Sequence, residues 1–95
     1  MSLFYDRNGR PLETMEWAAL LEDPAYKIIE KTPIQGADGE RGVSTVWLGL
    51  DHGFPGTPLF FETMVFPECE VEERYATRDE ALEGHKNIVN QLKGL

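Results

Sequence analysis

The chain has little cysteine, few basic residues and no long apolar run. Its 95 residues contain one cysteine, Cys69, and 9 lysines and arginines against 17 aspartates and glutamates. A single cysteine cannot close a disulfide within the chain, which argues against a secreted, disulfide-stapled scaffold. The N-terminus lacks the basic and apolar regions of a signal peptide, and no apolar stretch approaches the roughly 20 residues that span a bilayer. These absences predict a cytoplasmic protein.

The formal net charge of −8 opposes binding to nucleic acid and to anionic membranes, because both need Lys and Arg. We therefore expect no nucleic-acid partner and no membrane partner. The ordinary interpretation of the acidity is solubility. The alternative is an acidic mimic of nucleic acid, which would use the carboxylates crowded near the last third of the chain: Glu68, Glu70, Glu72, Glu73, Asp79, Glu80 and Glu83.

The composition is that of an ordinary globular protein, with 41% hydrophobic and 27% charged residues. A chain of this length suffices for one domain and not for two. It shows no internal repeat, low-complexity segment or linker. We therefore expect one domain over residues 1–95.

The first part of the chain predicts a hairpin and a helix. Residues 3–5 can pair with 10–12 around the Asp-Arg-Asn-Gly turn at 6–9. A helix is expected over 14–22, capped by Thr14, because Trp17, Leu20 and Leu21 recur at helical spacing. Asp-Pro at 23–24 should end it.

Strands are expected at 25–32, 42–50 and 59–66, with a weaker one at 70–75. The sequence Thr77-Arg78-Asp79-Glu80 fits a capping box at the start of the last helix. The apolar face of that helix contains Ala81, His85, Ile88 and Leu92. The predicted class is α+β: an antiparallel meander of three to four strands with two helices packed on it, in the order β-α-β-β-β-α.

Both central strands are apolar on both faces. In the strand at 43–50, one face carries Val43, Thr45, Trp47 and Gly49 and the other carries Ser44, Val46, Leu48 and Leu50. In the strand at 59–66, one face carries Leu59, Phe61, Thr63 and Val65 and the other carries Phe60, Glu62, Met64 and Phe66. A two-layer domain needs only one apolar sheet face, and soluble monomers rarely leave a large apolar patch bare. The helices could lie on opposite faces, a second copy could cover the patch, or another partner could. We favour a homodimer with Trp47, Phe61 and Val65 in its interface.

One group of three residues is a weak candidate for a catalytic or metal-binding site. Asp51 and His52 follow a strand and Glu62 lies in the next, so a hairpin could bring them together to bind a metal or exchange protons. No paired-histidine or HExxH spacing supports this, and a loop Asp, an exposed His and a surface Glu are the ordinary interpretation. His85 is expected to be a partly buried histidine that is hydrogen-bonded to the sheet, and Cys69 is flanked by acids that disfavour its thiolate. We therefore predict no catalytic residue, no metal and no cofactor.

Three stretches are distinctive: STVWLGLDH at 44–52, FETMVF at 61–66 and YATRDEALEGH at 75–85. Together they resemble a group of small proteins from bacteriophages and prophages that have no assigned activity. The resemblance implies a phage context and transfers no catalytic residue.

The function that the sequence favours is a non-enzymatic protein-interaction module: a phage-encoded homodimer that acts on a host or virion protein. The alternatives are a small enzyme or metal site built on Asp51, His52 and Glu62, and the acidic mimic of nucleic acid described above.

Overall fold

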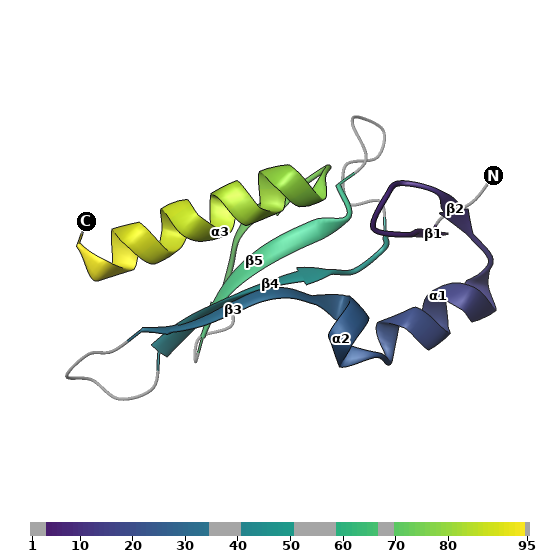
Figure 1. The fold of residues 1–95 in the computed structure, drawn as a ribbon, viewed down its shortest axis with the longest axis horizontal. Helices are drawn as coiled ribbons and strands as arrows, with labels where there is room; N and C mark the ends of the chain where they lie inside the picture. The colour runs from purple at the N-terminus through teal and green to yellow at the C-terminus, as the bar shows by residue number, and fades with distance from the viewer. Residues whose placement is uncertain (1–3, 35–40, 51–58, 67–69, 95) are drawn as a thin grey trace.

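A four-stranded antiparallel sheet with three helices packed on it organises the structure, a computed structural model that describes residues 4–34, 41–50, 59–66 and 70–94 (Figure 1). The predicted α+β class is confirmed. A separate two-stranded hairpin precedes the sheet, whose strand order is β3-β4-β5-β6. The elements are β1 (Phe4–Tyr5), β2 (Pro11–Leu12), α1 (Thr14–Leu21), α2 (Pro24–Lys27), β3 (Ile28–Ile34), β4 (Arg41–Trp47), β5 (Phe61–Phe66), β6 (Glu70–Tyr75) and α3 (Arg78–Lys93).

The predicted N-terminal hairpin forms around an aspartate-centred turn. The Asp6 carboxylate accepts hydrogen bonds from the backbone N–H of Asn8 at 2.8 Å and of Arg10 at 2.9 Å. Phe4 stacks on Trp17 of α1, with ring centroids 4.2 Å apart. The hairpin is thereby tied to the first helix.

The segment between α1 and the sheet differs from the prediction. Asp23 and Pro24 end α1, as expected, but they also begin α2, because proline suits the first turn of a helix and Asp23 accepts from the N–H of Ala25 at 3.0 Å. The predicted strand at 25 therefore begins only at Ile28. It continues through Pro33 to Ile34, since an edge strand tolerates a residue without an N–H.

The boundaries of three other elements also shift. The residue that caps α1 is Glu13, and Thr14 is the first helical residue. Strand β4 ends at Trp47 rather than at 50, and β5 begins at Phe61 rather than at 59. Beyond Trp47 the regular ladder ends: the N–H groups of Leu48 and Gly49 both donate to the Phe60 carbonyl, and Leu50 forms an isolated bridge with Phe4.

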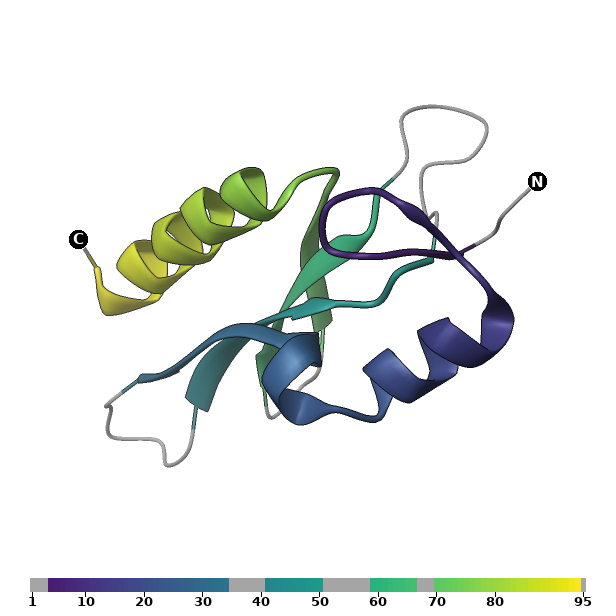
Figure 2. The same ribbon diagram turned by 45° about the vertical axis from the view of Figure 1, so that its right-hand side comes forward.

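Helix α3 lies along one face of the sheet, where it contacts all four strands, while α1, α2 and the hairpin gather at the other end of the molecule (Figures 1 and 2). Its buried positions, Ala81, Gly84, His85, Ile88 and Val89, follow helical spacing and include three of the four that the sequence predicted. Two core clusters result. One joins Ile88 and Val89 to the strands, and the other joins Ala81 to Trp47 and its neighbours.

One of the two hydrogen bonds of the predicted capping box forms at the start of α3. The Thr77 hydroxyl oxygen accepts from the Glu80 N–H at 3.1 Å. The same hydroxyl donates to the Glu80 carboxylate, which in a full capping box would accept from the Thr77 backbone N–H instead.

Thr77→Ala should lower the free energy of unfolding by about 0.5–2 kcal/mol, because it leaves a helix N–H without its acceptor. Urea denaturation checks this, with Thr77→Ser as the control that keeps the cap; an unchanged midpoint for Thr77→Ala would contradict it.

Candidate functional site

The residues predicted to form an interface lie in the core. Trp47 is 0% exposed, Phe61 1% and Val65 5%, and all three pack beneath α3 or against the N-terminal segment. The interface assignment of these three residues is corrected accordingly: the sequence identified two apolar faces, but α3 covers the one that contains them. The apolar surface that α3 leaves uncovered lies on the other face of the sheet.

That other face carries five apolar side chains, which we call the open face: Ile28, Val46, Met64, Phe66 and Val71. The registers place Ile28 opposite Val46, and Met64 opposite Val71, so they share one side of the sheet. Ile28 is 40% exposed and Val71 43%, among the largest exposures of any large apolar residue in the described part of the chain. The other three are half-buried. The structure therefore has the second apolar face that the sequence predicted.

The position of the Phe66 ring on the open face depends on the absence of a side chain at Gly42. A side chain at Gly42 would overlap the Phe66 ring, so only glycine lets that ring lie over β4. The ammonium group of Lys31 lies 5.4 Å from the centroid of the same ring. One end of the open face is thus an aromatic ring with a cation beside it.

The charges on this side of the sheet nearly balance. Glu62 faces Arg74 in register, with 3.4 Å between Oε2 and Nε, and its side chain is buried, whereas that of Arg74 is 42% exposed. Lys31 is the third charged residue that the register places there. Among the residues that the strand registers place on this side, two are basic and one is acidic, in a protein of net charge −8.

The proposed Asp51, His52 and Glu62 constellation is represented by Glu62 alone, because Asp51 and His52 lie outside the described residues, as does Cys69. Glu62 is paired with Arg74, which leaves its carboxylate engaged. Within the ranges that the structure describes, no group of three or more His, Cys, Asp or Glu side chains could hold a metal ion.

A chain of buried hydrogen bonds crosses the sheet beneath α3. It confirms the prediction that His85 is buried and hydrogen-bonded to the sheet, whereas the threonine and tyrosine members of the chain were not predicted. His85 contacts the Thr32 hydroxyl through Nε2 and the Thr45 hydroxyl through Nδ1, each at 2.8 Å. Thr45 meets Thr63 at 2.5 Å, and the Tyr75 hydroxyl donates to Thr63 at 3.0 Å. One side chain from each of the four strands takes part, in the order β3, β4, β5 and β6.

The hydrogen bonds of this polar chain can all be donated in the same direction along it, so that each side chain has a partner. If Tyr75 donates to Thr63, Thr63 can donate to Thr45, Thr45 to His85 Nδ1, and His85 Nε2–H to Thr32. Burial lowers the pKa of His85, with the charge of Glu30 opposing the shift, and burial raises the pKa of Tyr75. Both side chains are therefore neutral near pH 7. The one sequence signal for the threonines was the alternation that puts Thr45 on the face of Trp47 and Thr63 on the face of Phe61.

The acids of the mimic hypothesis gather in part. Glu73, Asp79, Glu80 and Glu83 line one hollow of about 450 Å³ between β6 and α3, together with Tyr75, Gly84 and Asn87. Glu68 lies outside the described residues. The acidic side of the molecule is therefore the α3–β6 flank and not the open face.

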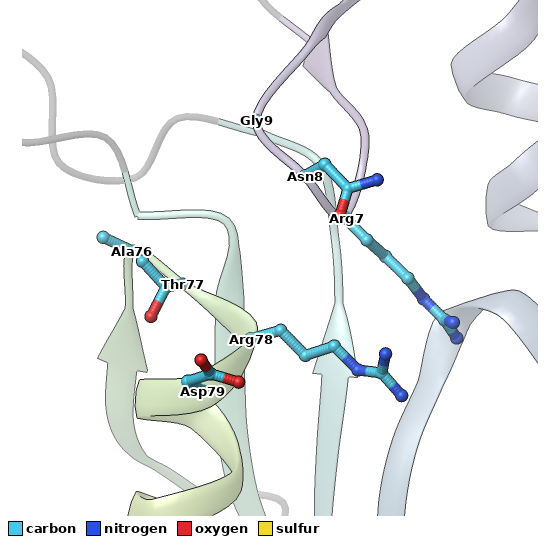
Figure 3. Close-up of a pocket in the computed structure, with 7 residues that line it drawn as sticks. All are labelled: Arg7, Asn8, Gly9, Ala76, Thr77, Arg78 and Asp79. Carbon is cyan, nitrogen blue, oxygen red and sulfur yellow. The ribbon is translucent and has the colours of Figure 1, made fainter.

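A second hollow, of about 370 Å³, lies where the hairpin turn meets the start of α3 (Figure 3). The side chains of Arg7 and Arg78 both extend from it in the same direction, away from Asn8 and Ala76. Arg7 stacks on the Tyr26 ring at 4.3 Å and donates to the carbonyls of Ala25 and Tyr26. Its Nη2 fastens the hairpin to α2, while its buried Nε has no hydrogen-bond partner among the described residues.

Comparison of the chain with protein-family models, with curated proteins and with solved structures found no match. In the described part of the chain, no helix has the length and apolar character needed to cross a membrane.

Proposed function

We propose that this protein is a non-enzymatic interaction module that forms a homodimer through the open face of its sheet. The observation that supports the proposal is the pair of strongly exposed apolar residues, Ile28 and Val71, at the two edges of a face whose centre is also apolar. Covering such a face removes apolar surface from water.

The size of the face suits a modest dimer. Strands about 4.8 Å apart, each roughly six residues long at about 3.3 Å per residue, give four strands a face of roughly 19 by 20 Å. Two copies packed on it would cover roughly 760 Å² of sheet in total, less than the roughly 1,000 Å² of a specific stable interface, so the dimer should be weak. A dissociation constant in the micromolar range is therefore expected.

Charge favours a second copy as the occupant of the open face. Two molecules of charge −8 repel each other through most of their surfaces. The open face is where that repulsion is weakest, because Lys31 and Arg74 outnumber Glu62 there. A two-fold axis lets each apolar residue meet the same patch on the other copy.

Analytical ultracentrifugation at about 1–100 µM protein and moderate salt tests the dimer. The wild type should change from monomer to dimer over this range. Ile28→Lys and Val71→Lys should each weaken the association at least tenfold, because each places an unpaired charge in the contact. Both sites are exposed in one chain, so folding should change by less than about 0.5 kcal/mol.

Met15→Lys is the matched control. Met15 is 82% exposed on α1 and lies off the open face, so the same substitution should leave the association unchanged. A wild type that remains monomeric at about 100 µM, or a Met15→Lys variant that loses the dimer as completely as Val71→Lys, would contradict the proposal.

A further inference from the structure

The two outer strands of the sheet differ in how well their edges are protected. The free edge of β3 is hindered from pairing with another strand by Pro33, which has no N–H, and by a bulge between Ile28 and Glu30. Strand β6 contains no proline, and residues 71–74 are all exposed. Among the described residues, β6 pairs only with β5, so the backbone groups on its other side face no strand.

A groove runs beside this edge. It is the hollow of about 450 Å³ between β6 and α3, and the side chains of Tyr75, Gly84 and Asn87 are part of its lining. A side chain at Gly84 would overlap the Tyr75 ring, so this glycine lets the helix approach the strand closely. Alternate side chains of a strand added to β6 would point into the groove.

We propose that β6 is a docking edge for an extended, basic segment of another protein, which pairs with it as a fifth strand. The edge supplies the backbone hydrogen bonds, and the groove accepts alternate side chains. The charge of the occupant is set by Glu73, Asp79, Glu80 and Glu83, which line the groove and attract Lys and Arg.

A second copy of the chain does not fit this edge. Pairing β6 with β6 would bring Glu72 and Glu73 of each copy close to those of the other, and like charges opposed across a strand pair are destabilising. The site is therefore distinct from the open face, and it does not depend on the proposed homodimer.

Fluorescence anisotropy with a labelled eight-residue peptide of alternating Lys and Thr tests the proposal. The comparison peptide replaces each Thr by Pro, which keeps the charge but removes half of the backbone donors. The Lys-Thr peptide should bind at least about tenfold more tightly. On binding, hydrogen exchange should slow in β6.

The protein variants identify the surface. Glu83→Lys should weaken binding of the Lys-Thr peptide about fivefold or more, whereas Glu22→Lys, the same change at an exposed position at the end of α1, should have little effect. Ile28→Lys should bind as the wild type does, whether or not the homodimer forms. Equal binding of the two peptides would mean charge attraction alone and would overturn the proposal, as would the absence of binding or an equal loss in both Glu variants.

Discussion

Trp47→Ala should reduce the free energy of unfolding by about 3–5 kcal/mol, the range for truncating a fully buried aromatic side chain. Trp47 is 0% exposed and is the largest fully buried residue of the described chain. Its ring meets Tyr26 edge-on at 4.9 Å, and its Nε1–H donates to the Tyr5 carbonyl at 2.9 Å. The substitution leaves a cavity and removes one hydrogen bond to the Tyr5 carbonyl where the hairpin, α2 and the sheet meet.

Urea denaturation at about pH 7.5 measures this loss. Met15→Ala provides the control, since a residue that is 82% exposed should change stability by less than about 0.5 kcal/mol. A loss below about 1 kcal/mol for Trp47→Ala would mean that the residue is not in the core. In that case the placement of Trp47 in an interface would regain its basis.

The sequence predicted those helices and strands whose signals lie within the element itself. Helix α3 was predicted because Thr77 and Glu80 signal its start and its apolar positions recur with one period. The two strong strands were predicted because β-branched and aromatic residues alternate along them. Helix α2 was missed because Asp23 and Pro24 end one helix and begin another, and a stop signal does not specify the next element.

What the sequence could not predict depends on contacts between distant segments. Alternation separated Phe61 from Met64 and Phe66 correctly, but it could not say which face of the neighbouring strand lies on the same side, or which face α3 would cover. Choosing between the faces requires the path of the chain from β6 into α3. The same reason hid the polar chain, because Thr45 and His85 are 40 residues apart and Thr45 also fits a β-strand by propensity alone.

The polar chain explains how one layer of the core can hold polar groups without being destabilised by them. A buried hydroxyl or imidazole is costly only when it lacks a partner, and each of these five side chains has one. Thr45→Val keeps the shape of the side chain but leaves His85 Nδ1 and Thr63 each with one contact fewer. It should cost about 1–3 kcal/mol, whereas Thr14→Val, at an exposed position on α1, should cost less than about 0.5 kcal/mol.

The same chain makes stability depend on pH near neutrality. Burial lowers the pKa of His85 in the folded state, whereas in the unfolded state it returns to its ordinary value of about 6.5. Between those two values the unfolded chain binds more protons, so the free energy of unfolding should fall as pH decreases from about 7.5 to 5.5. Protonation also forces both ring nitrogens to donate, which reverses the hydrogen bond between Thr45 and Nδ1.

Urea denaturation of the wild type and of His85→Gln at several pH values between about 7.5 and 5.5 isolates this effect, because every other titrating group is common to both proteins. His85→Gln should be less stable at about pH 7.5 but should lose less stability toward about pH 5.5. Glu30→Gln should show the opposite change, a steeper loss than the wild type, because the Glu30 carboxylate is the charge that favours protonated His85. Parallel pH profiles for the wild type and His85→Gln would show that His85 does not titrate differently on folding, and that the buried chain tolerates the imidazolium form.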